Sequence, residues 1–217
     1  MKNLLIGIAL LILIGIAGFL YRNSLESHDQ ALQGPAAAHK LCLDGSLAKA
    51  DTIGGEPKCP ASNVQDTDNG ISYVLPEGYV ADEHAYGADS TLIGAFMKDA
   101  TTTSSQTIII RAYPIPSGET AQQVMLEETR LEPSDMNPKD MSAFTPKIIG
   151  TNTFSSIVVE RFEGVVDSAY FLARADDVLR FDIVEKDVQD WTSPTLDINS
   201  LPEHQAFLKM LNTLQVK

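Results

Sequence analysis

The sequence has 217 residues and a formal net charge of −13, because 29 acidic side chains outnumber 16 basic ones. Affinity for nucleic acid and for anionic lipid headgroups comes largely from Lys and Arg, so this balance argues against both kinds of partner. A net charge this far from zero keeps a protein soluble, or complements a basic surface on a protein partner.

The first element is an unbroken apolar run, Leu4–Leu20, which comes after Lys2. As a helix rising about 1.5 Å per residue, the run would span roughly 25 Å, near the lower end of what crosses a bilayer. No pair of small residues suited to cleavage stands directly after the run, whereas 36–38 (AAA) offers one well beyond it. We therefore predict an uncleaved signal anchor over residues 1–21, with a cleaved signal peptide as the alternative.

The orientation of the anchor depends on its flanking charges and on the length of the polar chain behind it. Lys2 on one side is nearly balanced by Arg22 and Lys40 on the other, so the positive-inside rule decides little. A short amino terminus usually stays in the cytoplasm while the long polar part is translocated. We expect a single-pass membrane protein, held by residues 4–20, with its body outside the cytoplasm in the cell envelope.

Residues 22–69 show little periodicity and are predicted to form a flexible spacer. The only two cysteines, Cys42 and Cys59, bracket turn signals in this segment. Outside the cytoplasm such a pair is most simply a disulfide that closes a hairpin-sized piece. A metal site would need more ligands than two distant thiols and His39, and redox catalysis favours a Cys-x-x-Cys spacing.

A globular domain is predicted over residues 70–217. Strands are indicated at 71–75, 91–98, 107–113, 147–149, 154–163, 167–174 and 178–185. Helices are predicted after Thr120 and Ser200, each of which has Gln123 or Glu203 three residues later as a capping box. The fold class is α+β, a largely antiparallel sheet of six to seven strands partly covered by two helices and preceded by one transmembrane helix.

Two end motifs of this domain carry a resemblance to a known family. Residues 71–79 (ISYVLPEGY) resemble the strand followed by Pro-x-Gly-aromatic that opens PsbP-like domains, and 207–214 (FLKMLNTL) resembles their last helix. The family includes extrinsic photosystem subunits and bacterial proteins anchored to membranes. The resemblance implies an extracytoplasmic accessory or binding role, and it implies no catalytic residues because the family has no shared set.

Motifs that carry chemistry are not found. The four histidines lack metal-binding spacing, and the sequence has no nucleophile elbow, phosphate loop or dinucleotide fingerprint. Residues 66–70 (DTDNG) approach a calcium loop, but the glycine stands one place early, so a polar turn is expected. We therefore assign no catalytic, cofactor or metal residues, and we expect no cofactor.

Trp191 is the only tryptophan, in a loop after the last predicted strand. It is a candidate partner contact, because exposed tryptophans often anchor interfaces. The alternative is that it packs its loop onto the core.

The leading hypothesis is a membrane-tethered extracytoplasmic binding or assembly accessory module without catalytic activity, with a protein partner. One alternative is an envelope hydrolase that uses carboxylates from distant strands. Another is a domain that binds a small ligand between the sheet and a helix.

Overall fold

The computed structural model describes residue 42 and residues 59–82, 90–98 and 107–217. The chain divides into two units, Met1–His39 and Lys40–Lys217, and all of the described residues belong to the second. The predicted anchor over residues 1–21 and most of the predicted spacer lie outside them. Within the described residues, no helix is both long and apolar enough to cross a membrane.

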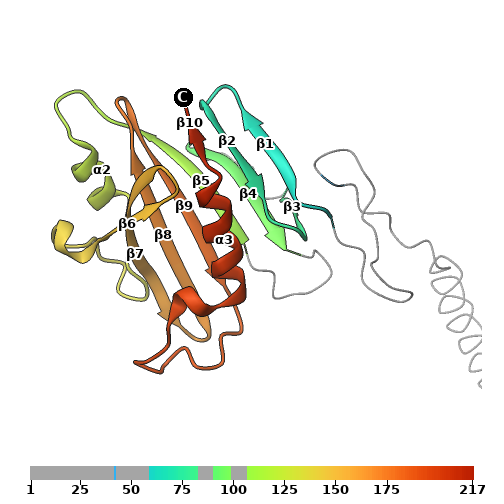
Figure 1. Ribbon diagram of the computed structural model, residues 1–217. Coiled ribbons are helices and arrows are strands. Elements are labelled where there is room, and N and C mark those ends of the chain that lie inside the picture. The colour runs from blue at the N-terminus through green and yellow to red at the C-terminus, as the bar shows by residue number, and fades with distance from the viewer. Residues whose placement is uncertain (1–41, 43–58, 83–89, 99–106) are drawn as a thin grey trace, which may run out of the picture. The chain divides into compact units, whose positions relative to one another are not determined.

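The body is built on an antiparallel sheet of seven strands in the order β3-β4-β5-β9-β8-β7-β6 (Figure 1). This sheet confirms the predicted antiparallel α+β architecture, although β3 was not predicted. The strand bounds are β3 Tyr79–Ala81, β4 Leu92–Lys98, β5 Thr107–Pro114, β6 Thr145–Ile149, β7 Asn152–Phe162, β8 Val165–Ala173 and β9 Asp177–Glu185.

A second, three-stranded sheet was not predicted from the sequence. It has the order β1-β2-β10, from β1 Ser62–Asp66, β2 Ile71–Leu75 and β10 Gln215–Val216. β1 lies before residue 70, so the folded part of the chain includes a strand from the segment expected to be a spacer. The turn from β1 to β2 is closed by Asp66, whose carboxylate accepts hydrogen bonds from the backbone and side chain of Asn69.

Two α-helices are described, α2 Ala121–Glu127 and α3 Pro202–Asn212, together with the short 3₁₀ helices η1 Met141–Ala143 and η2 Ile198–Ser200. The predicted capping box of Thr120 and Gln123 is present at α2. The box predicted at Ser200 is wrong: Leu201 is the N-cap of α3 and makes no side-chain cap. The Ser200 hydroxyl instead donates to the carbonyl of Asp197 in η2.

The larger core lies on one face of the seven-stranded sheet, which we call the α3 face. Alternate strand residues point to this face, as period-2 alternation requires. α3 and the three-stranded sheet cover them (Figure 1). Residues that are fully buried in this core include Ile108, Ile110, Phe154, Leu179, Phe181, Ile183, Phe207 and Leu211.

The opposite face, which we call the α2 face, has a smaller core under α2. Its buried apolar side chains include Val124, Phe144, Ala169, Phe171 and Val178. The ring centroids of Phe144 and Phe171 lie 5.7 Å apart in an edge-to-face arrangement. Beside this core, the α2 face also buries the charged side chains of Arg180 and Asp182.

Cys42 and Cys59 form a disulfide, with their Cα atoms 5.5 Å apart. The predicted pairing is therefore confirmed. Both cysteines are buried against Val80 of β3, with Met97 of β4 packed alongside. The backbone N–H of Gly78 donates to the carbonyl of Cys59, which fixes the start of the described body next to β3.

Candidate functional site

The richest group of polar side chains surrounds a cavity of about 400 Å³ on the α3 face, which we call the α3 pocket. It lies over β6, β7 and β8, beside η2 and the start of α3. Its apolar wall is formed by Ala143, Ile157, Val158 and Ile198. Its polar side chains include Lys147, Ser156, Ser168, Tyr170, Asn199 and His204.

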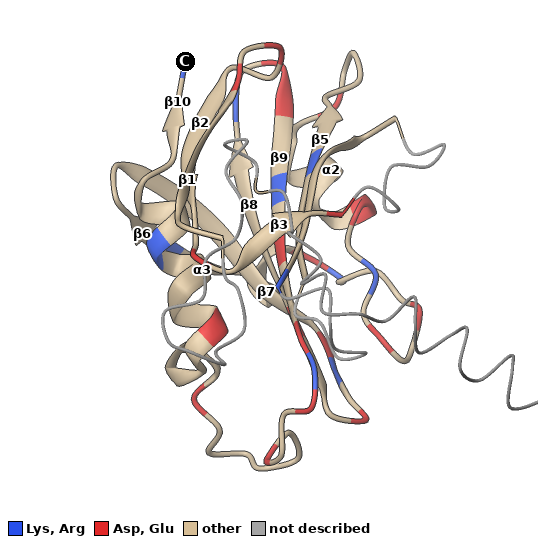
Figure 2. Ribbon diagram, turned by 90° about the vertical axis from the view of Figure 1, so that its right-hand side faces the viewer, with Lys and Arg blue, Asp and Glu red and all other residues tan. Residues whose placement is uncertain are grey.

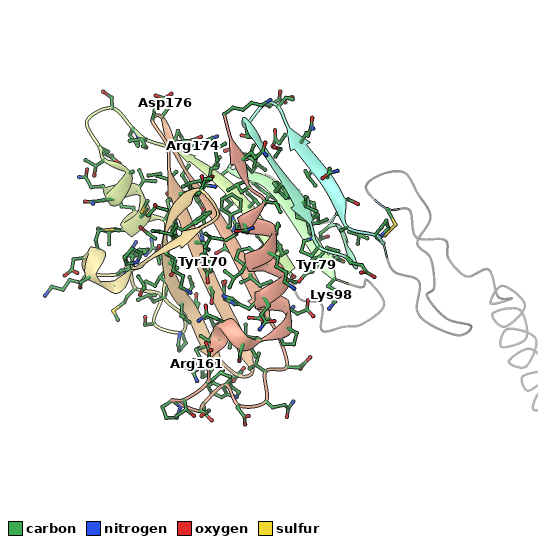
Figure 3. The ribbon with its side chains drawn as sticks, viewed as in Figure 1. Tyr79, Lys98, Arg161, Tyr170, Arg174 and Asp176 are labelled. Carbon is green, nitrogen blue, oxygen red and sulfur yellow. A yellow bond between two sulfur atoms is a disulfide. The ribbon has the colours of Figure 1, made fainter. Side chains whose placement is uncertain are left out.

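Strand register explains why these polar side chains converge. Ser156 of β7 is the direct partner of Tyr170 of β8, and Ser168 lies two residues before Tyr170 on the same side of the strand. Lys147 reaches the same place from the edge strand β6. α3 crosses above Tyr170, as Figure 3 shows, so the pocket forms between sheet and helix.

Three of these groups, together with Glu185 of β9, form a continuous hydrogen-bond series from the interior to the pocket. The Glu185 carboxylate lies 3.1 Å from Nδ1 of His204, and Nε2 of His204 lies 2.8 Å from the Tyr170 hydroxyl. The Lys147 ammonium then donates to the Tyr170 hydroxyl over 3.1 Å. Since a carboxylate only accepts, Nδ1 carries a proton, and in the neutral imidazole Nε2 then accepts from the Tyr170 hydroxyl.

Burial sets the electrostatics of this series. The pKa of Tyr170 is raised, first by burial and then by the charge of Glu185. The pKa of Lys147 is lowered by burial, against a smaller opposite effect of Asp197. Tyr170 is therefore held as a neutral phenol, which suits a fixed hydrogen-bonding group better than a base.

Glu185 also replaces the missing cap of α3. Its second carboxylate oxygen accepts from the backbone N–H of His204 over 3.1 Å, in the first turn of the helix. A carboxylate at this end satisfies an otherwise unpaired N–H and complements the helix dipole. One buried side chain of β9 thus positions both the helix and the histidine ring that faces Tyr170.

Two serines of the pocket differ in what their hydroxyls do. The Ser156 hydroxyl donates to the carbonyl of Thr145 over 3.0 Å, which ties β7 to β6. The Ser168 side chain belongs to a residue that is only 4% exposed, and its hydroxyl has no hydrogen-bond partner among the described residues. A buried polar group without a partner is costly and is therefore informative.

A second cavity of about 500 Å³ lies along the outer side of α3, where Val74, Lys98, Lys209 and Met210 contribute to its wall. Two of its charged groups, Lys98 and Glu203, are engaged with one another. Lys98 pairs with Glu203, and the Tyr79 hydroxyl donates to the same carboxylate over 3.3 Å (Figure 3). Glu77 and Lys209 also line this groove, but among the described residues it has no buried side-chain polar atom left without a partner, unlike the α3 pocket with Ser168.

The α2 face buries an ionic cluster. Nε of Arg180 donates to Asp182 over 2.8 Å, and Arg111 lies 3.4 Å from the other oxygen of that carboxylate. Arg180 and Asp182 stand on β9 and Arg111 on its neighbour β5, two strands on which Figure 2 shows charged positions. Arg180 also donates to the carbonyl of Glu128 after α2.

Asp167 adds a second carboxyl to this cluster. One of its oxygens is buried and has no hydrogen-bond partner among the described residues. The pKa of Asp167 is raised well above its ordinary value by burial and by the neighbouring charge of Asp182. Neither carboxyl contributes to the walls of the cavities described above.

Trp191, the candidate partner contact, packs against Phe162 with ring centroids 6.0 Å apart. Arg161 holds its loop by donating to the carbonyls of Trp191 and Ser193 at the lower end of the sheet (Figure 3). Trp191 is half-buried.

The histidines fall into two groups. His204 is 1% exposed and packed, whereas 28, 39 and 84 lie outside the described residues. Within the described part of the chain, no group of three or more His, Cys, Asp or Glu side chains is placed to hold a metal ion.

Comparison with solved structures gives a likeness of fold. No family model and no curated protein matches the sequence. The structure is similar to the solution structure of cyanobacterial PsbP (CyanoP) from Synechocystis sp. PCC 6803, with a TM-score of 0.47 and 13% sequence identity. The match covers 73% of this chain and 94% of that chain. This likeness agrees with the weak PsbP-like resemblance of the two end motifs in the sequence. Neither observation assigns a ligand, a partner or a functional residue.

Proposed function

We propose that this chain is a membrane-tethered extracytoplasmic accessory module that binds a small polar ligand in the α3 pocket and has no catalytic activity. The observation that carries the proposal is the pocket itself. It combines an apolar wall with Lys147, Asn199 and the unpartnered hydroxyl of Ser168. Ligand sites are typically cavities of this kind, mostly apolar with a few fixed polar groups.

Binding is favoured over catalysis by how the polar groups are engaged. Both ring nitrogens of His204 already have partners inside the protein, Glu185 and Tyr170. The raised pKa of Tyr170 disfavours the phenolate that a base or nucleophile would need. These groups fix the shape of the pocket and the direction of its hydrogen bonds.

The hydrolase alternative has less support. Asp167 and Asp182 are close, buried carboxyls on adjacent strands, which is the arrangement such an enzyme would need. However, Asp182 is neutralised by Arg180 and Arg111, and the cavities described above do not reach it. We therefore interpret this pair as part of the framework.

The proposed location rests on the sequence and is compatible with the disulfide. A Cys42–Cys59 bridge is stable in an oxidising compartment such as the cell envelope. The run over residues 4–20 is proposed to hold the body at the membrane. Protease added to intact spheroplasts should digest an external body, whereas a body that stays undigested would contradict this orientation.

Native mass spectrometry of the full chain, purified in mild detergent from its own membranes, tests the proposed function. We expect a small molecule to be retained and to be lost in Ala143→Trp, because Ala143 is exposed at the edge of the pocket. Ala173→Trp is the matched control, since Ala173 is exposed at the end of β8. A retained molecule that survives Ala143→Trp, or none at all, would count against the pocket.

A protein partner is proposed as well, with Trp191 as its contact. The half-buried ring and its neighbour Phe162, which is 38% exposed, form a small aromatic surface. Interface anchors are often tryptophans of this kind. In-membrane crosslinking of the full chain should yield a specific partner that Trp191→Ala reduces, and unchanged crosslinking in that variant would move the contact elsewhere.

A further inference from the structure

We propose that the α3 pocket accepts a small organic monocarboxylate, with Lys147 and Ser168 as the residues that bind its anionic group. This inference rests on the proposed function and names the chemical class of the ligand. Some polar groups around the pocket already have partners within the protein, whereas others do not. The groups without such partners indicate the chemistry that a ligand would supply.

Lys147 is the one Lys, Arg, Asp or Glu among the described residues that form the pocket wall. Its ammonium donates to two neutral acceptors, the Tyr170 hydroxyl at 3.1 Å and the Asn199 side-chain oxygen at 2.7 Å. In the part of the chain that the structure describes, no carboxylate lies within ion-pair distance of it. The charge of Asp197 acts on this ammonium without forming an ion pair with it, so an anion that uses the third N–H would stabilise the partly buried charge directly.

Ser168 supplies the second polar contact. Its hydroxyl is buried in the pocket wall and is unused by the described part of the fold, unlike that of Ser156, which bonds to β6. A carboxylate oxygen is the acceptor that a lone hydroxyl donor lacks. The Ser156 hydroxyl therefore stabilises the sheet, whereas the Ser168 hydroxyl is available to a ligand.

The pocket also limits the size and charge of the anion. A volume of about 400 Å³ admits a small organic molecule whose body packs on Val158 and Ile198. One ammonium balances one negative charge, so a dianionic phosphate ester would leave a charge uncompensated in a partly buried site. A monocarboxylate with an apolar body fits both conditions.

The test uses the full chain in detergent with benzoate as the probe, and with benzamide and phenyl phosphate as its neutral and dianionic analogues. Calorimetric titration should show that benzoate binds at least about 10-fold more tightly than either analogue. Lys147→Met should weaken benzoate binding by about 10-fold to 100-fold, because a charge-assisted hydrogen bond is lost. Lys139→Met, at an exposed site, is the matched control and should change nothing.

The serine pair gives a second readout that a purely structural role would not produce. Ser168→Ala should weaken benzoate binding by about 5-fold while the melting temperature of the free protein stays the same or rises. Ser156→Ala should instead lower the melting temperature of the free protein, because the Ser156 hydroxyl donates to the carbonyl of Thr145 in the sheet.

Three results would overturn the inference. Benzamide could bind as tightly as benzoate, Lys147→Met could retain full affinity, or neither benzoate nor acetate could bind at millimolar concentration. In each case the proposed function is judged separately by the molecule retained in native mass spectrometry and its loss in Ala143→Trp. If the retained molecule is neutral, the proposed binding function stands and the proposed anionic ligand is rejected.

Discussion

The buried polar groups on the α3 face and on the α2 face of the same sheet have different roles. On the α3 face, Glu185, His204 and Tyr170 form a hydrogen-bonded series that leads to a cavity. On the α2 face, Arg180 and Asp182 neutralise one another within the sheet. Buried polarity alone therefore does not mark a site. The α3 face is distinguished by polar groups that border open space and are left available by the fold.

This comparison predicts that the two faces respond differently to substitution. Changes on the α2 face should alter stability and leave ligand binding intact. Changes to the Glu185–His204–Tyr170 series on the α3 face should alter both. Free energies of unfolding in urea, measured beside benzoate affinity, separate the two responses.

The largest effect is expected for Asp182→Asn. Removal of this carboxylate leaves the buried guanidinium of Arg180, and that of Arg111, without their shared anion. Breaking a buried ion pair in this way should lower the free energy of unfolding by about 3 kcal/mol. Asp190→Asn, at an exposed position, is the control. Equal stability of the two variants would show that the cluster is not held as described.

A smaller loss is expected for Glu185→Gln. The amide can replace only one of the two acceptors that cap α3 and orient His204. We expect the free energy of unfolding to fall by about 1–2 kcal/mol and benzoate affinity to fall with it. Glu127→Gln, on the exposed side of α2, should stay within about 0.5 kcal/mol of the parent. If the variant is destabilised but binds benzoate with full affinity, Glu185 has no role in ligand binding.

Local patterns in the sequence predicted the framework well. In β9, Leu179, Phe181 and Ile183 alternate with Arg180 and Asp182, and the structure places the two sets on opposite faces as predicted. The disulfide and the α2 capping box were likewise predicted, because each depends on residues that are close in sequence or unique in type.

The elements that escaped prediction lack such local signals. β1 has the polar sequence SNVQD and is a strand because β2 pairs with it. The cap of α3 comes from β9 rather than from Ser200, so no local box could reveal it. Tertiary pairing overrides local propensity in both cases.

The residues of the α3 pocket were not predicted from the sequence for the same reason, although one residue gave a local signal. Glu185 falls at the next inward position after Leu179, Phe181 and Ile183 on β9. A carboxyl at the end of a buried row indicates a partner elsewhere in the chain, because a buried charge must be paired. Its partner, His204, stands on a helix that the alternation of β9 cannot identify.

The smallest and only stabilising effect is expected for Asp167→Asn. The folded-state pKa of Asp167 is raised above its ordinary value of 3.8 by burial and by Asp182, so folding favours the protonated carboxyl. Its contribution to stability is fully present below that ordinary value and is lost as the pH rises through the folded-state pKa. Because asparagine stays uncharged, the variant should melt at a higher temperature than the parent at pH 8, and the gap should close toward pH 4.

Melting curves across that pH range check the sign of the effect, with Asp176→Asn as an exposed control on the turn before β9. A gain that is independent of pH would mean that packing, not ionisation, is responsible. A loss at pH 8 would mean that the Asp167 charge is needed by the arginines. Benzoate affinity should not change in either variant, because the α2 face serves the sheet and the pocket opens on the other side.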